Sequence, residues 1–335
     1  SNAAGLIEGS GAVLQFGTAA SGVGGTFTVS GGFYDAAVTQ VTGGMLDLSA
    51  ASGVSFGTSV AVSGSGVLGL GTLFVDVNVL DAGSGGQVDS NGIVVVNGPA
   101  VLASTALSGS GTMVLEGGGS IGGALSLNGG LTLQNSGTLV WAAGSITLGS
   151  GTAAAAGVLH NAGGAVLDIE TNGTISSPDG GSVFNAGTIL SEGFGSTVVD
   201  TGMSNSGTIA VSAGTLTFGQ AVSGSGAFVL NGTATLDLVD GAGSGSTMQF
   251  AYPGGTLETQ ALGGFGSVIS GFVAGDVIDA AGVGFVTGTT AVGFSGGTLT
   301  VTEGAASASF VLAGSYAAGG FQIGTDAHGG TDITL

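Results

Sequence analysis

The chain has 335 residues, of which 20 are Asp or Glu and none is Lys or Arg, so its formal charge is −20. Without basic side chains it has nothing to neutralise phosphates, and we therefore expect no nucleic-acid partner and no attraction to anionic lipid headgroups. The absence of cysteine also excludes disulfides and thiolate metal sites.

The composition favours an ordered chain. Glycine contributes 74 residues, but 43% of the chain is hydrophobic and its aliphatic residues alternate with Thr, Ser and Gly, which disordered segments do not show. Residues 1–3, Ser-Asn-Ala, are typical of a tag remnant and are left out of the fold prediction. No apolar run is long enough for a membrane helix, so we expect no membrane insertion by this segment, and any export signal outside it.

Residues 4–244 carry a repeated strand pattern. Short segments in which apolar side chains alternate with small polar ones are separated by Gly-Ser, Gly-Gly or Asn-Gly. This alternation is typical of strands with one buried face, and no window shows the spacing of a helix. Examples are residues 12–16, 26–29, 45–48, 67–70, 73–77 and 93–96.

A phrase of Asn, one or two small residues, Gly, Thr and an aliphatic residue recurs between residues 131 and 214. We interpret each copy as a turn followed by the start of a strand, because Asn and Gly tolerate positive φ and Thr suits a half-buried pleated surface. The copies at Asn135, Asn161, Asn185 and Asn205 recur 20 to 26 residues apart, which is typical of a solenoid. They are Asn135-Ser-Gly-Thr-Leu139, the degenerate Asn161-Ala-Gly-Gly-Ala-Val166, Asn172-Gly-Thr-Ile175, Asn185-Ala-Gly-Thr-Ile189 and Asn205-Ser-Gly-Thr-Ile209.

A second phrase, Ser-Gly-Ser-Gly, marks turns at residues 63–66, 108–111 and 223–226. Its first two copies are consistent with coils of about 22 residues, and therefore with about ten coils in the repeat region. We predict an all-β chain in which residues 4–244 form a right-handed parallel β-helix, because stacked coils pair every strand and enclose a continuous apolar column. A β-sandwich would explain the short strands but not the recurrence.

The composition of the sequence changes near residue 245. A Gly/Ser turn and Tyr252-Pro253-Gly-Gly255 precede a segment that is richer in Phe. Large rings suit a closing cap better than a narrow solenoid corner, and an exposed solenoid end needs a cover against edge-to-edge association. We therefore predict a β-rich capping module at residues 245–335.

The C-terminal residues form an ordered series that resembles the closing module of repetitive extracellular proteins of Gram-negative bacteria, described as haemagglutinin-like adhesins or autotransporter passengers. The Asn-x-Gly-Thr-Ile phrases are similar to the passenger repeats of that group. The resemblance implies a Gly/Thr/Asn-rich β-solenoid, exported to the cell surface. The series consists of Phe272-Val-Ala-Gly-Asp-Val-Ile-Asp279, Thr298-Leu-Thr-Val-Thr302, Phe310-Val-Leu-Ala-Gly314 and Phe321-Gln-Ile-Gly-Thr-Asp-Ala-His-Gly-Gly-Thr-Asp332.

The inventory of reactive residues argues against an enzyme. Polysaccharide lyases rely on Arg or Lys, which the chain lacks, whereas glycoside hydrolysis needs only two carboxylates. The candidate pairs are Asp168 with Glu170 and Asp237 with Asp240, although two acids on an exposed face are more often solvated surface residues.

The two histidines, His160 and His328, have no Gly-x-Ser-x-Gly nucleophile turn that precedes a helix to complete a triad. We therefore expect no catalytic residues.

Calcium is the one cofactor that the sequence suggests. Asp276 and Asp279 flank a short strand, Asp326 and Asp332 flank a Gly-rich turn, and hard oxygen ligands at turns suit Ca²⁺. Against this site, the calcium-binding nonapeptide of β-rolls is not repeated, and Asp276 also suits an Asx turn.

We expect a non-enzymatic structural and adhesive segment of a large secreted bacterial surface protein, located outside the cell. It would act as a stiff rod that contacts glycans or proteins on host or neighbouring cells. Two alternatives remain open: a glycan-processing enzyme on the same scaffold, and a self-associating component of a surface layer or fibre.

Overall fold

The computed structural model describes residues 6–17, 25–149, 155–262 and 265–335. Within these ranges the chain forms strands and turns but no helix, and parallel strands stack into a β-solenoid of about 12 turns. The predicted all-β, parallel β-helix class is therefore confirmed. The chain divides into two compact units, residues 1–168 with 175–184 and residues 169–174 with 185–335.

The first unit begins with long strands that stack in parallel, β1 on β3 and β3 on β4, while β2 pairs with the end of β3. From β5 onward the strands are short and build three ladders of parallel pairs. The long strands are β1 (Leu6–Phe16), β3 (Phe33–Asp47) and β4 (Gly53–Gly71), and β2 spans Thr26–Thr28.

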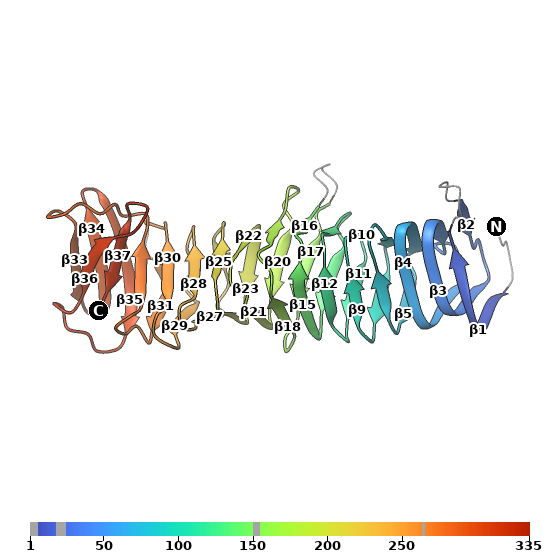
Figure 1. Ribbon diagram of the computed structural model, residues 1–335, viewed down its shortest axis with the longest axis horizontal. Helices are drawn as coiled ribbons and strands as arrows, with labels where there is room; N and C mark the ends of the chain where they lie inside the picture. Colours follow the sequence, from blue (N-terminus) through green and yellow to red (C-terminus); the bar gives the residue numbers. More distant parts are fainter. Residues whose placement is uncertain (1–5, 18–24, 150–154, 263–264) are drawn as a thin grey trace. The chain divides into compact units, whose positions relative to one another are not determined.

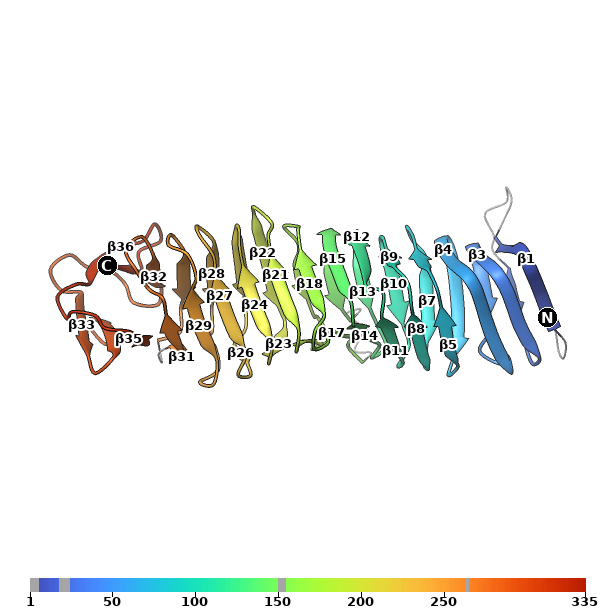
Figure 2. The same ribbon diagram turned by 90° about the horizontal axis from the view of Figure 1, so that it is seen from below.

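The three ladders of the first unit each take one strand from every coil (Figure 2). One contains β6 (Leu80–Ala82), β9 (Ala100–Leu102), β12 (Gly119–Gly122) and β15 (Thr138–Ala143). The second contains β7 (Gln87–Ser90), β10 (Thr105–Ser108), β13 (Leu125–Leu127), β16 (Ile146–Leu148) and β19 (Thr174–Ser176). The third contains β5 (Phe74–Val77), β8 (Ile93–Val96), β11 (Thr112–Leu115), β14 (Thr132–Asn135) and β17 (Val158–Asn161). Strands β18 (Val166–Ile169) and β20 (Ser182–Asn185) lie where the chain passes between the units.

The apolar and polar residues that alternate in the sequence point alternately into and out of the solenoid. In β11, Met113 and Leu115 are fully buried, whereas Thr112 and Val114 lie on the outer face. Ile93 pairs with Thr112, and Thr112 pairs with Thr132, so a coil here takes 19 or 20 residues. Because each coil repeats the same register, the inward side chains form continuous apolar columns.

The Asn phrases form turns that lead into strands, as predicted, because Thr138, Thr188 and Thr208 each begin a strand. Asn135 ends β14 and Asn161 ends β17, which are neighbouring strands of the third ladder, and each side chain is 1% exposed. A hydrogen bond of 2.9 Å from Asn135 Nδ2 to Asn161 Oδ1 joins them. In the second unit, Asn185 Nδ2 donates to Asn205 Oδ1 at 2.8 Å in the same way. Ser104 is the only non-glycine residue with positive φ among those described. Asn135, Asn161, Asn185 and Asn205 are therefore also buried rungs of ladders that join coils, and none of them has positive φ, whereas Asn172 is exposed.

The glycine of the phrase serves close approach between coils. Gly137 N donates to Asn135 Oδ1 at 3.2 Å, and a Cβ at Gly137 would lie 2.7 Å from Gly118 N and 2.8 Å from Glu116 O of the preceding coil. Gly137 is not among the glycines with positive φ. Its small size, rather than its backbone freedom, is what the corner requires.

The second unit continues the same pattern of parallel pairs (Figure 1). One ladder contains β21 (Thr188–Ser191), β24 (Thr208–Val211), β27 (Ala227–Leu230), β29 (Thr247–Phe250) and β31 (Phe265–Ser270). A second contains β22 (Ser196–Asp200), β25 (Thr215–Phe218), β28 (Thr235–Leu238), β30 (Thr256–Thr259) and β32 (Val277–Ala280). A third contains β23 (Gly202–Asn205) and β26 (Val222–Ser223).

The strand direction changes after β32, at the C-terminal end of the second unit. Strands β33 (Ala291–Ser295), β34 (Thr298–Glu303) and β35 (Ala306–Ala313) are antiparallel to one another, and β35 stacks in parallel on β31. Strands β36 (Gln322–Thr325) and β37 (Thr331–Thr334) form an antiparallel hairpin, here called the C-terminal hairpin, and β37 pairs antiparallel with β32. The expected β-rich end is thus present. Parallel pairing continues past residue 245, where the domain boundary remains a prediction, and residues 1–3 lie outside the described residues.

A cluster of aromatic rings fills the end of this unit. Phe272 lies 5.4 Å from Phe250 and 6.5 Å from Phe321, measured between ring centroids, and Phe294 lies 5.3 Å from Phe321. Tyr316 joins the cluster and donates a hydrogen bond of 3.2 Å to the Phe272 carbonyl. Aromatic packing therefore anchors the antiparallel strands to the last coils.

Candidate functional site

Asp276, the first of the four predicted calcium ligands, is occupied by backbone amides. It is fully buried, and its Oδ1 accepts hydrogen bonds from Gly254 N at 2.8 Å and Gly255 N at 3.3 Å. Its Oδ2 accepts from Val273 N at 2.9 Å. This carboxylate thus ties its own turn to the preceding coil, with both of its oxygens bonded to backbone amides.

The other three predicted ligands do come together. Asp279 of β32 lies directly opposite Asp332 of β37 in the antiparallel pair. Asp326 lies in the turn of the C-terminal hairpin, where its Oδ1 accepts hydrogen bonds of 2.7 Å from His328 N and from Gly330 N. The Asp326 charge acts on both Asp279 and Asp332.

The Asp279–Asp332 pair ends a longer row of acids. Asp237 of β28 pairs in register with Glu258 of β30, and Glu258 pairs with Asp279. Neighbouring strands are about 4.8 Å apart, so one carboxyl group follows another along the outer face. We call Asp237, Glu258, Asp279 and Asp332 the carboxyl row.

Burial and mutual repulsion raise the pKa values along the carboxyl row. Burial, followed by the charges of Asp332, Asp326, Glu258 and Asp237, raises the pKa of Asp279 from 3.8 to about 7. Asp279 is only 6% exposed, and its Oδ1 has no hydrogen-bond partner. A carboxylate in this position is costly when ionised.

The other members of the row shift in the same direction. Burial and the Glu258 charge raise the pKa of Asp237 to about 6, against a hydrogen bond from Thr217. Burial raises the pKa of Glu258, although His328 opposes the rise, and burial with the Asp326 charge raises that of Asp332. The row therefore retains protons at pH values where isolated carboxyl groups have lost them.

The geometry does not support a metal centre. Among the residues that the structure describes, no group of three or more His, Cys, Asp or Glu side chains is arranged to hold a metal ion. Since Asp276 is also committed to backbone amides, the four predicted aspartates do not fit a calcium site.

The acids considered for glycan hydrolysis lie in different surroundings. Asp237 lies in the carboxyl row, while its predicted partner Asp240 is exposed in the turn after β28. Asp168 is half-buried on β18, and Glu170 is exposed directly after the end of that strand. Trp141 is fully buried and so has no ring face to offer a sugar.

The two histidines lie on the surface of separate units. His160 is half-buried on the outer face of β17, where it pairs in register with Gln134. His328 is exposed in the turn of the C-terminal hairpin and lies close enough to Glu258 to affect its ionisation.

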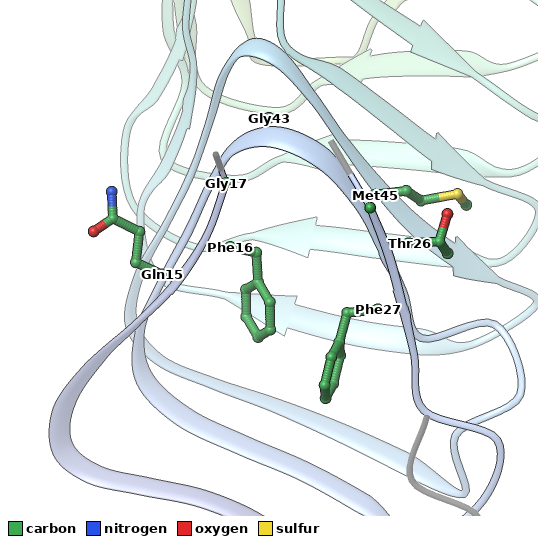
Figure 3. Close-up of a pocket in the computed structure, with 8 residues that line it drawn as sticks. Gln15, Phe16, Gly17, Thr26, Phe27, Gly43 and Met45 are labelled. Carbon is green, nitrogen blue, oxygen red and sulfur yellow. The ribbon is translucent and has the colours of Figure 1, made fainter. Parts of the chain in front are cut away.

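A cavity of about 290 Å³ opens at the first coil of the first unit. Figure 3 shows Phe16 and Phe27 pointing into it from β1 and β2, while Gln15 and Met45 point away. The two ring centroids lie 5.2 Å apart. Besides the two aromatic rings, glycines together with Gln15, Thr26 and Met45 line the cavity, and none of these residues is titratable.

Comparisons with other proteins leave the family open. The sequence matches no known protein family, and none of the curated protein sequences is significantly similar to it. None of the residues that the structure describes lies in a helix long and apolar enough to cross a membrane.

From the raised pKa values of the carboxyl row, we predict that the folded protein is more stable at acid pH than at alkaline pH. Because the pKa of Asp279 is about 7 when folded and 3.8 as an isolated group, the folded state binds more protons between these values. This stabilisation is complete below pH 4 and is lost as the pH rises through 7. We expect the free energy of unfolding, measured by urea denaturation, to fall by about 2 kcal/mol from pH 5 to pH 8.

The control variants are Asp279→Asn, which removes the most strongly shifted carboxyl group, and Asp240→Asn, which removes an exposed one. Asp279→Asn is expected to be the more stable protein at pH 8 and to lose most of the pH dependence. Asp240→Asn is expected to follow the unmodified chain. A stability that rises from pH 5 to pH 8 in the unmodified chain would contradict the assignment.

Proposed function

We propose that this chain is a non-enzymatic structural and adhesive segment of a large secreted bacterial surface protein. The observation that supports this most directly is how the described buried polar side chains are used. The Asn ladders, Asp276 and Thr259 all bond to neighbouring coils, the last through Thr259 Oγ1 to Leu238 O at 2.8 Å. At these positions, polar groups of the kind that an enzyme directs at a substrate hold coil to coil instead.

The outer faces supply the contact surface in this proposal. In the first unit, Phe74 is 63% exposed and pairs in register with Ile93, which is 46% exposed. Val95 and Val114 continue the apolar character of the same outer face. Exposed apolar side chains that adjoin one another mark surfaces for contact with other molecules.

An extracellular role also agrees with the composition. A chain without Lys or Arg offers no cleavage site to trypsin-like proteases, and a chain without cysteine needs no disulfide formation after export. These properties support the proposed location and the resemblance to adhesin and passenger repeats.

The proposal is tested by measuring binding and cleavage on the same glycans. The purified chain is applied to a glycan array and to fixed cells, and released reducing ends are assayed in parallel. We expect binding without cleavage, and about a tenfold weaker binding for the double variant Phe74→Ser/Ile93→Ser. A variant with Thr132→Ser on the same outer face is the matched control.

Two results would contradict the proposal. Release of reducing ends that disappears in Asp237→Asn would favour the glycan-processing alternative. A lack of binding to all glycans and cells, together with concentration-dependent association of the chain, would favour the surface-layer or fibre alternative.

A further inference from the structure

The C-terminal hairpin covers the edge of the last coil strand. Strand β32 pairs in parallel with β30 on one side, and on the other side it pairs antiparallel with β37 through Ile278–Ile333, Asp279–Asp332 and Ala280–Thr331. Ile333 is fully buried in this position. The hairpin lies at the C-terminal end of the ribbon in Figure 1. Removing β37 would therefore leave β32 as an edge strand, with unpaired amides and carbonyls.

The middle pair of this junction consists of two carboxyl groups. Directly opposite residues in an antiparallel pair have Cβ atoms about 5 Å apart, and like charges in that position are destabilising. Negative charge also comes from the other side of β32, since Glu258 lies on the neighbouring β30 and Asp237 on the next strand, β28. The chain has no Lys or Arg that might pair with these acids.

The hairpin turn adds one more acid and one histidine. Asp326 acts on Asp279 and on Asp332, whereas His328 acts on Glu258. His328 is exposed, and it acts on Glu258, the neighbour of Asp279 in the carboxyl row. The Oδ1 atom of Asp279 is buried and has no hydrogen-bond partner. Protonation of this carboxyl group therefore lowers the free-energy cost of burying it.

Contacts outside the junction hold the hairpin near the last coil at any pH. Thr331 Oγ1 donates to Val283 O at 2.7 Å, Phe285 N donates to Gly329 O at 3.0 Å, and Phe321 stacks on Phe272. None of these contacts involves a carboxyl group. A change in the junction can therefore loosen the pairing of β37 without detaching the whole C-terminal segment.

We propose that Asp279 and Asp332 form a proton-held latch, in which β37 stays paired with β32 while the carboxyl pair keeps a proton and separates from it when both groups ionise. Ionisation moves the proton to solvent water and leaves two facing carboxylates. As a consequence, β37 covers the edge of β32 at acid pH, and this edge is exposed near and above neutral pH. An uncovered edge of this kind is what another strand requires for pairing.

Hydrogen–deuterium exchange on the full chain tests the latch. Exchange is followed by mass spectrometry at pH 5.0 and 8.5, with EDTA in every sample and with correction for the intrinsic exchange rate at each pH. We expect protection of the β37 amides to be about tenfold or more lower at pH 8.5, while protection in β25 stays the same. In Asp332→Asn and in Asp279→Asn, β37 is expected to keep its protection at both pH values.

Asp240→Asn serves as the matched control, because it removes an acid of the same unit that lies outside the carboxyl row. It is expected to exchange like the unmodified chain. The proposal is overturned if β37 is equally protected at both pH values in the unmodified chain, or if both Asn variants keep the pH difference. It is also overturned if protection is lost across β25 and β28 together with β37, because that would be unfolding of the whole unit.

Discussion

Replacing Asn135 by alanine is expected to lower the free energy of unfolding of the first unit by about 4 kcal/mol. Asn135 Nδ2 donates to Asn161 Oδ1 at 2.9 Å and to Val166 O at 2.8 Å, and its Oδ1 accepts from Gly137 N at 3.2 Å. The side chain is 1% exposed, so water does not replace it freely. Each buried partner left without a hydrogen bond costs about 1–3 kcal/mol.

The measurement uses the fluorescence of Trp141, which is the only tryptophan and is fully buried in the first unit. Urea denaturation followed at this residue reports the unit that contains Asn135. The matched control is Gln134→Ala, since Gln134 is the neighbouring residue on the outer face and bonds only to Ser136. We expect a loss of less than about 1 kcal/mol for Gln134→Ala. Equal losses for the two variants would show that the ladder adds nothing beyond ordinary side-chain burial.

The Asn ladders illustrate which features of the fold could be predicted from the sequence and which could not. Period-two alternation and the recurring phrase were enough to predict stacked parallel strands, because both are local properties of the chain. The direction of the Asn side chain at a corner depends on how sharply the coil bends, and the phrase alone does not show this. Asn161, whose phrase is degenerate, lies in the ladder, whereas Asn172 precedes β19 rather than ending a strand of the same ladder.

The carboxyl row itself was not predicted from the sequence, although three of its members were named for other reasons. Asp279 and Asp332 were singled out as calcium ligands, but Glu258 was not singled out. The signal was present, because Asp237, Glu258 and Asp279 recur at a constant interval of 21 residues, each in a Thr-Leu or Val-Ile context. Asp332 has no such signal. It reaches the row through an antiparallel hairpin, which the repeat period does not describe.

Replacing Gly207 by alanine is expected to destabilise the second unit by about 3 kcal/mol, even though Gly→Ala often stabilises a strand or loop. A Cβ at Gly207 would lie 2.0 Å from Gly187 O and 2.7 Å from Ala186 C, and both atoms belong to the backbone of the preceding coil. Gly207 N also donates to Asn205 Oδ1 at 3.2 Å, so the residue has little room to shift without loss of the ladder. Overpacking that displaces backbone costs about 1–3 kcal/mol or more.

The control for Gly207 is a glycine of the same unit that has space around it. Gly293 of β33 has no heavy atom within 4 Å of an ideal Cβ and does not have positive φ. Gly293→Ala is expected to leave stability unchanged or to raise it by about 0.5 kcal/mol, because alanine narrows the unfolded ensemble. Urea denaturation followed by far-ultraviolet circular dichroism compares the two variants. If Gly207→Ala proves as stable as Gly293→Ala, close approach of neighbouring coils does not explain why the Asn phrase requires glycine.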